Sequence, residues 1–468
     1  MSSWQCSLRR GLERGLHRHL LAALLLGLVA LPPAAAGDAT AALFVPHVGE
    51  SSLDVTIQKL QRQLQQPPRP APLLRELGWC FVGKARASHD PGYYKLAEIA
   101  AREVTRKHAD DFDAALLLGH ALHNLHSFAA AEEVARGIVV RRGLAVDHAL
   151  LGDALLEQGK LSAAVHSYEK MMDLRPGPAA YGRAAQVRWL HGDVAGAVEA
   201  MAWAARSTGG DPAIDAWHRV QLGTWVLHAG HPKQAQQLAA AALQLAPSYA
   251  PALFLSGQCH VALDELAAAA VKLARAVEVA PLPANQWALL EVLRAQQVTR
   301  PAGPATAPRG TGDVAAAIAA LESQLLGRGS AADPRTVALY LATQDRDHER
   351  ALQLAEAELQ SRRDVYTHDA VAWAAWRAGR REKALSHLQS ALATGCLDPR
   401  MHLHAAAIRR SCLDLAGARA ALRVVERFRC GLLRSEQRLA DELAVQLSAH
   451  EQKSQVPYTK QNRKRRTR

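Results

Sequence analysis

The most regular hydrophobic pattern in the chain lies in residues 145–176, AVDHALLGDALLEQGKLSAAVHSYEKMMDLRP. Apolar residues recur there every three or four positions, which places them on one face of each of two short helices, 147–158 and 162–173. Small residues, Gly152 and Ala164, stand where the two helices must approach each other closely. The stretch therefore predicts a helix hairpin with an apolar face on each side, which needs neighbours to cover it.

The same pattern recurs about every 34 residues along the chain. Positions equivalent to Gly152, from Gly78 to Gly257, follow one another at intervals of 41, 33, 33, 38 and 34 residues. A Pro that closes the second helix recurs at intervals of 36, 35 and 34 residues, at Pro176, Pro212, Pro247 and Pro281. Hairpins of this length, with Leu-Gly early, Ala in the middle and Pro late, resemble the tetratricopeptide repeat (TPR) family. Residues 74–104, with Asp-Pro-Gly-Tyr-Tyr at 90–94, also resemble the opening repeat of exported bacterial TPR proteins.

The fold class predicted from this pattern is all-α, a right-handed α-solenoid of TPR-like helix hairpins. Good helix formers dominate, and no run alternates as a strand would. We expect an N-terminal array at 53–297, a Pro/Gly-rich linker at 298–312 and a C-terminal array at 313–450. The sequence leaves open whether the two arrays form one continuous solenoid or two hinged ones.

Two further expectations concern the ends of the arrays. Residues 37–52 carry no apolar period and are expected to be unstructured, with Ser52 capping the helix that follows. The hairpin at 399–429 is expected to close the solenoid, because terminal repeats need a polar outer face.

The first 36 residues have the features of a secretory signal peptide. Four Arg residues precede an apolar run at 20–31, and Ala34-Ala35-Ala36-Gly37 forms a small-residue cleavage site. Twelve apolar residues are fewer than the about 20 that a membrane-spanning helix needs. We therefore expect cleavage near Ala36-Gly37 and export to the periplasm or cell envelope. An uncleaved membrane anchor and a mitochondrial-type presequence are the alternatives.

Charge is concentrated at the two ends of the chain. The net charge is +12, of which the leader supplies +3 and residues 451–468 supply +6, so the repeats between them carry only +3. The basic tail at 451–468 is expected to be disordered and solvated, with weak contact to anionic lipid or a cell-wall polymer as the alternative. No specific nucleic acid is expected as a partner.

Motifs that carry chemistry are missing from the sequence. It has no Gly-rich phosphate loop, no Gly-x-Ser-x-Gly, no His-Glu-x-x-His and no Cys-x-x-Cys, so no enzyme activity, cofactor or metal is expected. The six cysteines are scattered and most are expected to be buried free thiols; one bridge among Cys396, Cys412 and Cys430 is the alternative. His120, His123 and His126 follow at i, i+3 and i+6, so they do not converge on one metal ion.

The resemblance to TPR proteins implies a binding groove, because the first helices of such arrays line the concave surface where a partner lies. The candidate groove residues are Trp79, His120, His123, Asp153, Gln186, Trp189, Trp217, Thr224, Phe254 and Gln258. This mixture of aromatic and neutral polar side chains suits an extended peptide, or a helix with apolar anchors. TPR domains that clamp a terminal carboxylate carry an Asn directly after the repeat Gly, with Lys nearby. This chain lacks both there, so binding should respond only weakly to salt.

These observations favour a non-enzymatic interaction scaffold or assembly factor that holds another protein or peptide in the periplasm or cell envelope. The alternative is a membrane-anchored TPR adaptor that uses its N-terminal segment as an anchor and its basic tail as a second contact. The identity of the partner is not encoded in any motif.

Overall fold

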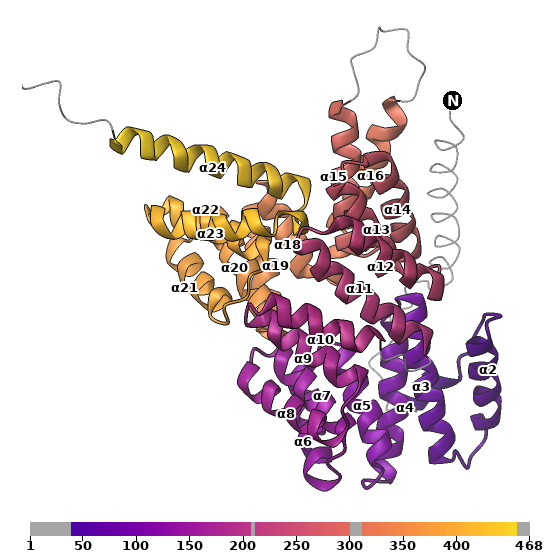
Figure 1. Ribbon diagram of the computed structural model, residues 1–468. Helices are drawn as coiled ribbons and strands as arrows, with labels where there is room; N and C mark the ends of the chain where they lie inside the picture. Colours follow the sequence, from indigo (N-terminus) through magenta and orange to yellow (C-terminus); the bar gives the residue numbers. More distant parts are fainter. Residues whose placement is uncertain (1–38, 207–210, 300–310, 456–468) are drawn as a thin grey trace, which may run out of the picture.

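The computed structural model describes residues 39–206, 211–299 and 311–455 (Figure 1). Within these ranges all regular secondary structure is helical, which confirms the predicted fold class. The predicted leader and all but the first five residues of the basic tail lie outside them. None of the helices in these ranges is long and apolar enough to cross a membrane.

Consecutive helices pack in pairs, as the sequence predicted. The predicted hairpin at 145–176 consists of α7 (Ala145–Glu157) and α8 (Leu161–Leu174), whose ends lie within two residues of the expected ones. The other hairpins of the N-terminal part are α3 (Ala71–Ser88) with α4 (Gly92–Lys107), α5 (Phe112–Asn124) with α6 (Phe128–Arg141), α9 (Pro178–Leu190) with α10 (Val194–Arg206), α11 (Pro212–His228) with α12 (Pro232–Leu245), and α13 (Ala250–Ala262) with α14 (Leu266–Val279).

The stacking continues past the Pro/Gly-rich segment. Helix α15 (Pro283–Thr299) packs on α14, on α16 (Thr311–Leu326) and on α18, and one apolar cluster extends from Ala269 of α14 to Leu447 near the C-terminal end. The remaining elements are α17 (Gly329–Ala332), α18 (Pro334–Thr343), α19 (His348–Ser361), α20 (Val365–Arg377), α21 (Arg381–Leu392), α22 (Pro399–Ser411), α23 (Leu415–Arg427), η2 (Arg429–Gly431) and α24 (Arg434–Gln455).

The C-terminal end of the solenoid differs from the prediction. The hairpin α22/α23 was expected to be terminal, but α24 follows it and packs against both helices. Its apolar residues Ala440, Leu443 and Leu447 are buried there. The expectation rested on the match of 399–429 to a repeat. Helix α24 is not part of a hairpin of its own and buries its apolar side against the preceding hairpin, so it shows no repeat pattern. The helix also runs to Gln455, five residues beyond the predicted end of the C-terminal array at 450.

Small residues allow the close helix contacts that the pattern implied. A Cβ atom at Gly152 would lie 2.3 Å from the ring of Tyr168, and one at Gly78 would lie 2.4 Å from Leu117 of the next hairpin. Ala164 is fully buried. Because neighbouring helices meet at these positions, side chains larger than Gly or Ala would push the helices apart.

The segment at 37–52 was expected to be unstructured, and the structure corrects this for the residues from 39 onward. They form η1 (Ala39–Phe44) and a loop that lies on α2 (Ser52–Leu64) and α4. The buried amide of Gln61 donates to the carbonyl oxygens of Leu43 (2.7 Å) and Val45 (2.9 Å). Helix α2 is capped by Ser51 rather than Ser52. These contacts come from side chains on the helix, so the loop's own composition did not reveal them.

Asp54 fastens the same loop from the first turn of α2. Its carboxylate pairs with Lys84 of α3 (2.6 Å) and with His47 of the loop (2.7 Å). The Lys84 contact, helped by His47, holds the pKa of Asp54 well below its usual range. The loop is thus held by side chains of the helices that follow it: Gln61, which is 18 residues from Leu43, and Asp54 with its partner Lys84.

The solenoid closes on itself. We call residues 71–279 (α3–α14) the first turn and residues 334–455 (α18–α24) the second turn. The second turn lies beside α9–α13 (Figure 1), and the contacts keep an almost constant sequence offset. Gly159 meets Arg363, Gly192 meets Gly395 and His228 meets Gly431. The two members of these pairs are 204, 203 and 203 residues apart in the sequence. Six repeats of about 34 residues span this offset, so the chain meets itself after about six hairpins.

Candidate binding groove

Four of the predicted groove residues lie in a section that the second turn leaves accessible. Trp79 of α3 is 39% exposed, and its ring lies 5.5 Å from the ring of His120 of α5. His123 and Asp153 are half-buried, on α5 and α7. We call Trp79, His120, His123 and Asp153 the open section of the groove.

His120 is held by two polar neighbours. Its Nε2 lies 2.9 Å from Nη2 of Arg86 and 3.3 Å from the amide nitrogen of Asn124. Burial, and then the nearby Arg86 charge, lower the pKa of His120 to about 4. The imidazole is therefore neutral near pH 7, and its Nε2 accepts a hydrogen bond from Arg86 or Asn124. His123, one turn further on, has a buried Nε2 without a hydrogen-bond partner among the described residues.

Asp153 does not offer a free negative charge to a ligand. Its carboxylate makes a two-point contact with Arg183 of α9, at 2.8 Å and 2.6 Å, and accepts a third hydrogen bond from the hydroxyl of Tyr168 (3.0 Å). Arg183 and the hydroxyl oppose the cost of burial and keep the pKa of Asp153 below its ordinary value. The open section therefore combines an exposed aromatic ring, the neutral imidazole of His120 and a neutralised ion pair.

The predicted residues in the middle of the groove have mixed environments. Trp217 of α11 is 40% exposed and stands edge-on to His218, with ring centres 5.1 Å apart. Gln186 and Thr224 are half-buried, and the Thr224 hydroxyl donates to the carbonyl of Val220 within its own helix (2.9 Å).

The last three predicted groove residues lie close to the C-terminal part of the chain. Trp189 is 2% exposed; its Nε1 donates to the hydroxyl of Tyr366 of α20 (3.0 Å). Phe254 packs against the apolar cluster of the C-terminal part, and Gln258 lies beside Cys430 and Leu432 at η2. The chain's own later repeats therefore cover Trp189, whereas Phe254 and Gln258 are half-buried.

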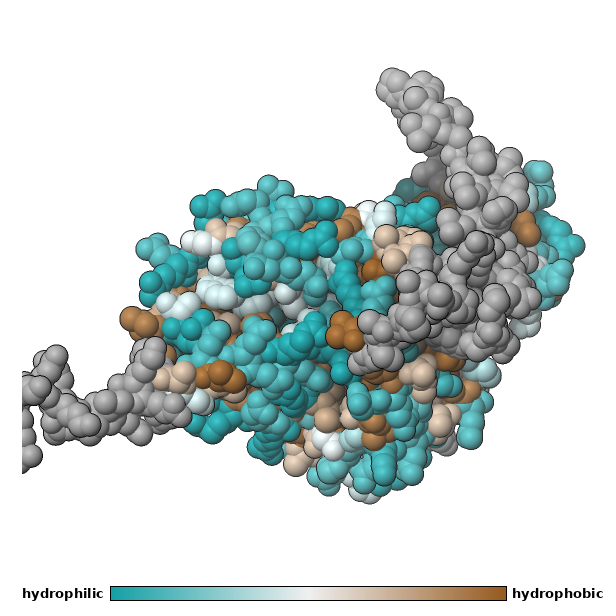
Figure 2. Space-filling model, turned by 90° about the horizontal axis from the view of Figure 1, so that it is seen from above, coloured by the Kyte–Doolittle hydropathy of each residue, from teal (hydrophilic) through white to brown (hydrophobic). Residues whose placement is uncertain are grey.

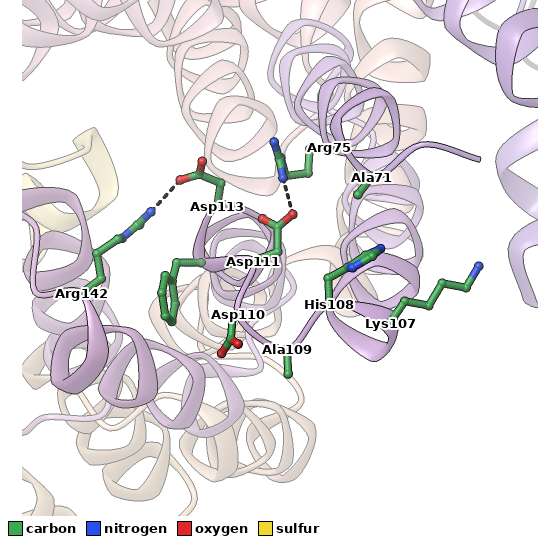
Figure 3. A pocket seen from close by; sticks show the side chains of 10 residues that line it. Ala71, Arg75, Lys107, His108, Ala109, Asp110, Asp111, Asp113 and Arg142 are labelled. Carbon is green, nitrogen blue, oxygen red and sulfur yellow. Dashed lines mark hydrogen bonds and ion pairs between the residues drawn. The ribbon is translucent and has the colours of Figure 1, made fainter. Parts of the chain in front are cut away.

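A hollow on the described surface lies elsewhere, between the end of α4 and the start of α5 (Figure 3). It is open to solvent and has a volume of about 660 Å³. Arg75 points to Asp111, and Arg142 reaches Asp113 (2.6 Å) (Figure 3). Arg142 also pairs with Asp147 (2.6 Å). Because its arginines are already paired with carboxylates, the hollow has no obvious preference for an anion or a cation. The sequence analysis did not identify this place.

No group of three or more His, Cys, Asp or Glu side chains in the described part of the chain has the arrangement of a metal site. Cys80, Cys259, Cys396, Cys412 and Cys430 are free thiols, so the alternative bridge among the last three is not formed. Burial raises the pKa of the Cys259 and Cys396 thiols to about 12, which keeps them protonated.

Two residues that shape the open section escaped sequence reasoning, Arg86 and Arg183. Arg183 follows Asp153 by 30 residues, so the two face each other from successive hairpins. Opposite charges spaced by about one repeat are visible in the sequence and could have predicted this ion pair. Arg86 lies 34 residues before His120, again one repeat away.

The surface seen from above in Figure 2 is mainly hydrophilic, with hydrophobic residues in small separate groups. Three tryptophans are nevertheless exposed among the described residues: Trp79 (39%) and Trp217 (40%) on first helices, and Trp203 (54%) on the second helix α10.

Comparison with known proteins adds little beyond the fold. No family model matches the chain, and no curated protein matches it. Among solved structures, the human IFIT1 dimer with PPP-AAAA covers 75% of this chain and 97% of its own, at 12% identity and a TM-score of 0.42. Yeast Tom70 covers 86% and 93%, at 13% identity and a TM-score of 0.36. YrrB, described as a TPR protein with an unusual peptide-binding site, covers 42% and 98%, at 15% identity and a TM-score of 0.29.

Similarities as low as these carry no argument about function. The description as TPR-like rests on the chain itself: paired helices, repeats near 34 residues, and Gly or Ala at the close contacts. In these respects the structure is a TPR-like α-solenoid, as the sequence predicted.

Proposed function

We propose that this protein is a non-enzymatic scaffold that binds a segment of another protein in the open section of its groove. The observation that carries the proposal is Trp79, a large aromatic side chain that is 39% exposed on the inner helix α3, beside the rings and polar groups of α5. Buried aromatic anchors dominate many protein interfaces, and an exposed one on a concave face offers the same contact to a partner.

The chemistry of the open section favours an extended peptide with an apolar or aromatic side chain placed against Trp79. The polar atoms of His120, Asn124 and Arg86 lie next to that ring and can bond the peptide backbone. The Asp153–Arg183 pair is already neutralised, so the partner needs no strong charge. Binding should therefore change little between low and moderate salt.

We further propose that the protein acts in the periplasm or cell envelope, where it is exported by its N-terminal leader. The support is the sequence of residues 1–37 alone. The membrane-anchored adaptor is the alternative. N-terminal sequencing of the mature protein separates the two, since cleavage would give a chain that begins near Gly37. Contact of the basic tail with anionic lipid or a cell-wall polymer stays a proposal of the same kind.

Site-specific photo-crosslinking in cells tests partner binding. A photoreactive residue at position 79 should give a discrete adduct, and the same residue at Val271 should not, because Val271 is 44% exposed on α14, a second helix outside the groove. Mass spectrometry of the adduct identifies the partner. Equal labelling from both positions, or none from position 79, would contradict the proposal.

A further inference from the structure

The contact between the two turns joins two different edges of the solenoid. One edge is made of the turns inside hairpins, such as residues 158–160; we call it the hairpin-turn edge. The other is made of the loops between hairpins, such as residues 362–364; we call it the inter-hairpin edge. Gly159, Gly192 and His228 lie at the hairpin-turn edge of the first turn, and they meet loops of the inter-hairpin edge of the second turn.

Charge and apolar contacts both contribute to this joint. Arg362 Nε lies 2.5 Å from the carboxylate of Glu157, and Arg434 lies 3.1 Å from that of Asp264. In each case the cation belongs to the inter-hairpin edge and the carboxylate to the hairpin-turn edge. Apolar residues of the inter-hairpin edge are buried here: Cys396 is 0% exposed and Leu432 is 3% exposed.

Among the described residues, the inter-hairpin edge of the first turn and the hairpin-turn edge of the second turn have no counterpart. The inter-hairpin edge of the first turn carries a row of exposed apolar residues: Leu144, Leu174, Ile214 and Leu245, which are 37–55% exposed. Leu282, in the loop that follows the first turn, continues the row and is 41% exposed. Arg175 stands exposed next to Leu174. The inter-hairpin edge of the second turn buries its apolar residues against the first turn. The inter-hairpin edge of the first turn therefore resembles one side of an interface that lacks its partner.

The hairpin-turn edge of the second turn has the complementary features. Its turns lie at 344–347, 378–380 and 412–414. Leu413 is 78% exposed and holds a left-handed backbone conformation (φ 64°), which makes it protrude from the turn. Asp347 and Asp414 are exposed on this edge. They correspond to Glu157 and Asp264, the carboxylates of the first turn's hairpin-turn edge that pair with arginines in the joint.

We propose that the partner of these two edges is a second copy of this chain, stacked head to tail. The inter-hairpin edge of the first turn in one copy would lie on the hairpin-turn edge of the second turn in the next, and so repeat between molecules the joint that already exists within one. The contact is heterologous, because each copy contributes a different edge, and it leaves one edge free at each end. This inference is independent of peptide binding in the groove.

Sedimentation velocity of the purified full chain tests the proposal over a range of concentrations. We expect the weight-average mass to rise above 50.5 kDa as the concentration increases. Leu174→Asp and Leu413→Asp each place a charge on one edge, and each variant alone should remain monomeric. Both residues are more than half exposed, so neither change should lower the thermal stability. Val271→Asp, an exposed residue away from both edges, is the matched control and should assemble as the unmodified chain does.

Mixing the two variants gives the sharper result. Leu174→Asp retains an intact hairpin-turn edge and Leu413→Asp an intact inter-hairpin edge, so a 1:1 mixture should form dimers and nothing larger. A symmetric dimer would not be restored by mixing. A chain that stays monomeric at every concentration, or variants that assemble normally, would overturn the proposal.

Discussion

Trp79 and Trp189 occupy inner helices of the same solenoid and have opposite environments. Trp79 is 39% exposed, and its ring lies 5.5 Å from that of His120, one hairpin away. Trp189 is 2% exposed, stacks on Trp225 with ring centres 5.5 Å apart, and bonds Tyr366, which is 177 residues further along the chain. Both positions face inward because the repeat places them there. Whether an inward residue serves a partner or the fold depends on where the second turn lies.

The most informative experiment compares the loss of these two rings. Trp189→Ala removes a buried ring and should lower the free energy of unfolding by about 3–5 kcal/mol. Trp79→Ala removes a ring that is partly in water and should cost about 1 kcal/mol or less. Urea denaturation of both variants measures the difference. Equal losses would mean that the second turn does not cover Trp189 in solution.

The close helix contacts within the first turn should give the next largest effect. Gly152→Leu places a side chain where Tyr168 already lies and should cost about 1–3 kcal/mol. Gly137→Ala on α6 is the control, since a Cβ there meets nothing within 4 Å; the gain in helix propensity should stabilise that variant by about 0.5–1 kcal/mol. Thermal melting distinguishes the two, and the interpretation fails if Gly152→Leu melts unchanged.

A single ion pair of the joint between the turns should contribute less. Glu157→Gln keeps the shape of the side chain but removes the charge that faces Arg362, and should cost about 1–2 kcal/mol. Hydrogen exchange should become faster around residues 362–366, which the pair holds against the first turn. Glu169→Gln is the control, because its His166 partner is 3.9 Å away and both side chains are mainly exposed. Slower or unchanged exchange would show that the joint does not depend on this pair.

The smallest expected effect is on the pH dependence of stability, in the open section. Burial and Arg86 lower the pKa of His120 to about 4 in the folded chain, against 6.5 as the ordinary value. The unfolded chain therefore binds more protons at His120 between these two values, so the stability is full above pH 6.5 and falls as the pH drops toward 4. His120→Gln should reduce that fall, and His166→Gln, at an exposed position, should not. Melting temperatures at pH 7 and pH 5 measure it; identical slopes in all three proteins would contradict the assignment.

Local features of the fold could be read from the sequence with good accuracy. The period near 3.6 fixed α7 and α8 to within two residues, and Gly152 was correctly placed at a close contact. The predictions for two segments near the ends of the solenoid were wrong. The loop before α2 is ordered by Gln61, and α24 lies on the last hairpin as a single helix. In both cases the stabilising contacts come from another element. The hydrophobic pattern of a segment describes that segment alone and does not show what packs against it.

The candidate site was predicted less completely. The sequence placed the ten groove residues on inner helices, and the structure assigns them to different surroundings: Trp79 is accessible, Trp217 is partly accessible, and Trp189 is covered. The polar partners Arg86 and Arg183 were missed, although each lies about one repeat from the residue it contacts. A search for polar pairs at the repeat spacing would have found both.

The sequence by itself determined the helices, their pairing and the side of each helix that faces inward, because those features depend on residues within one or two repeats. The meeting of Gly192 with Gly395 was decided only by the tertiary structure. Each hairpin turns the next by a small angle, and about six such rotations accumulate before the chain meets itself. No local pattern encodes that sum, so the covered and accessible parts of the groove become distinguishable only in the folded molecule.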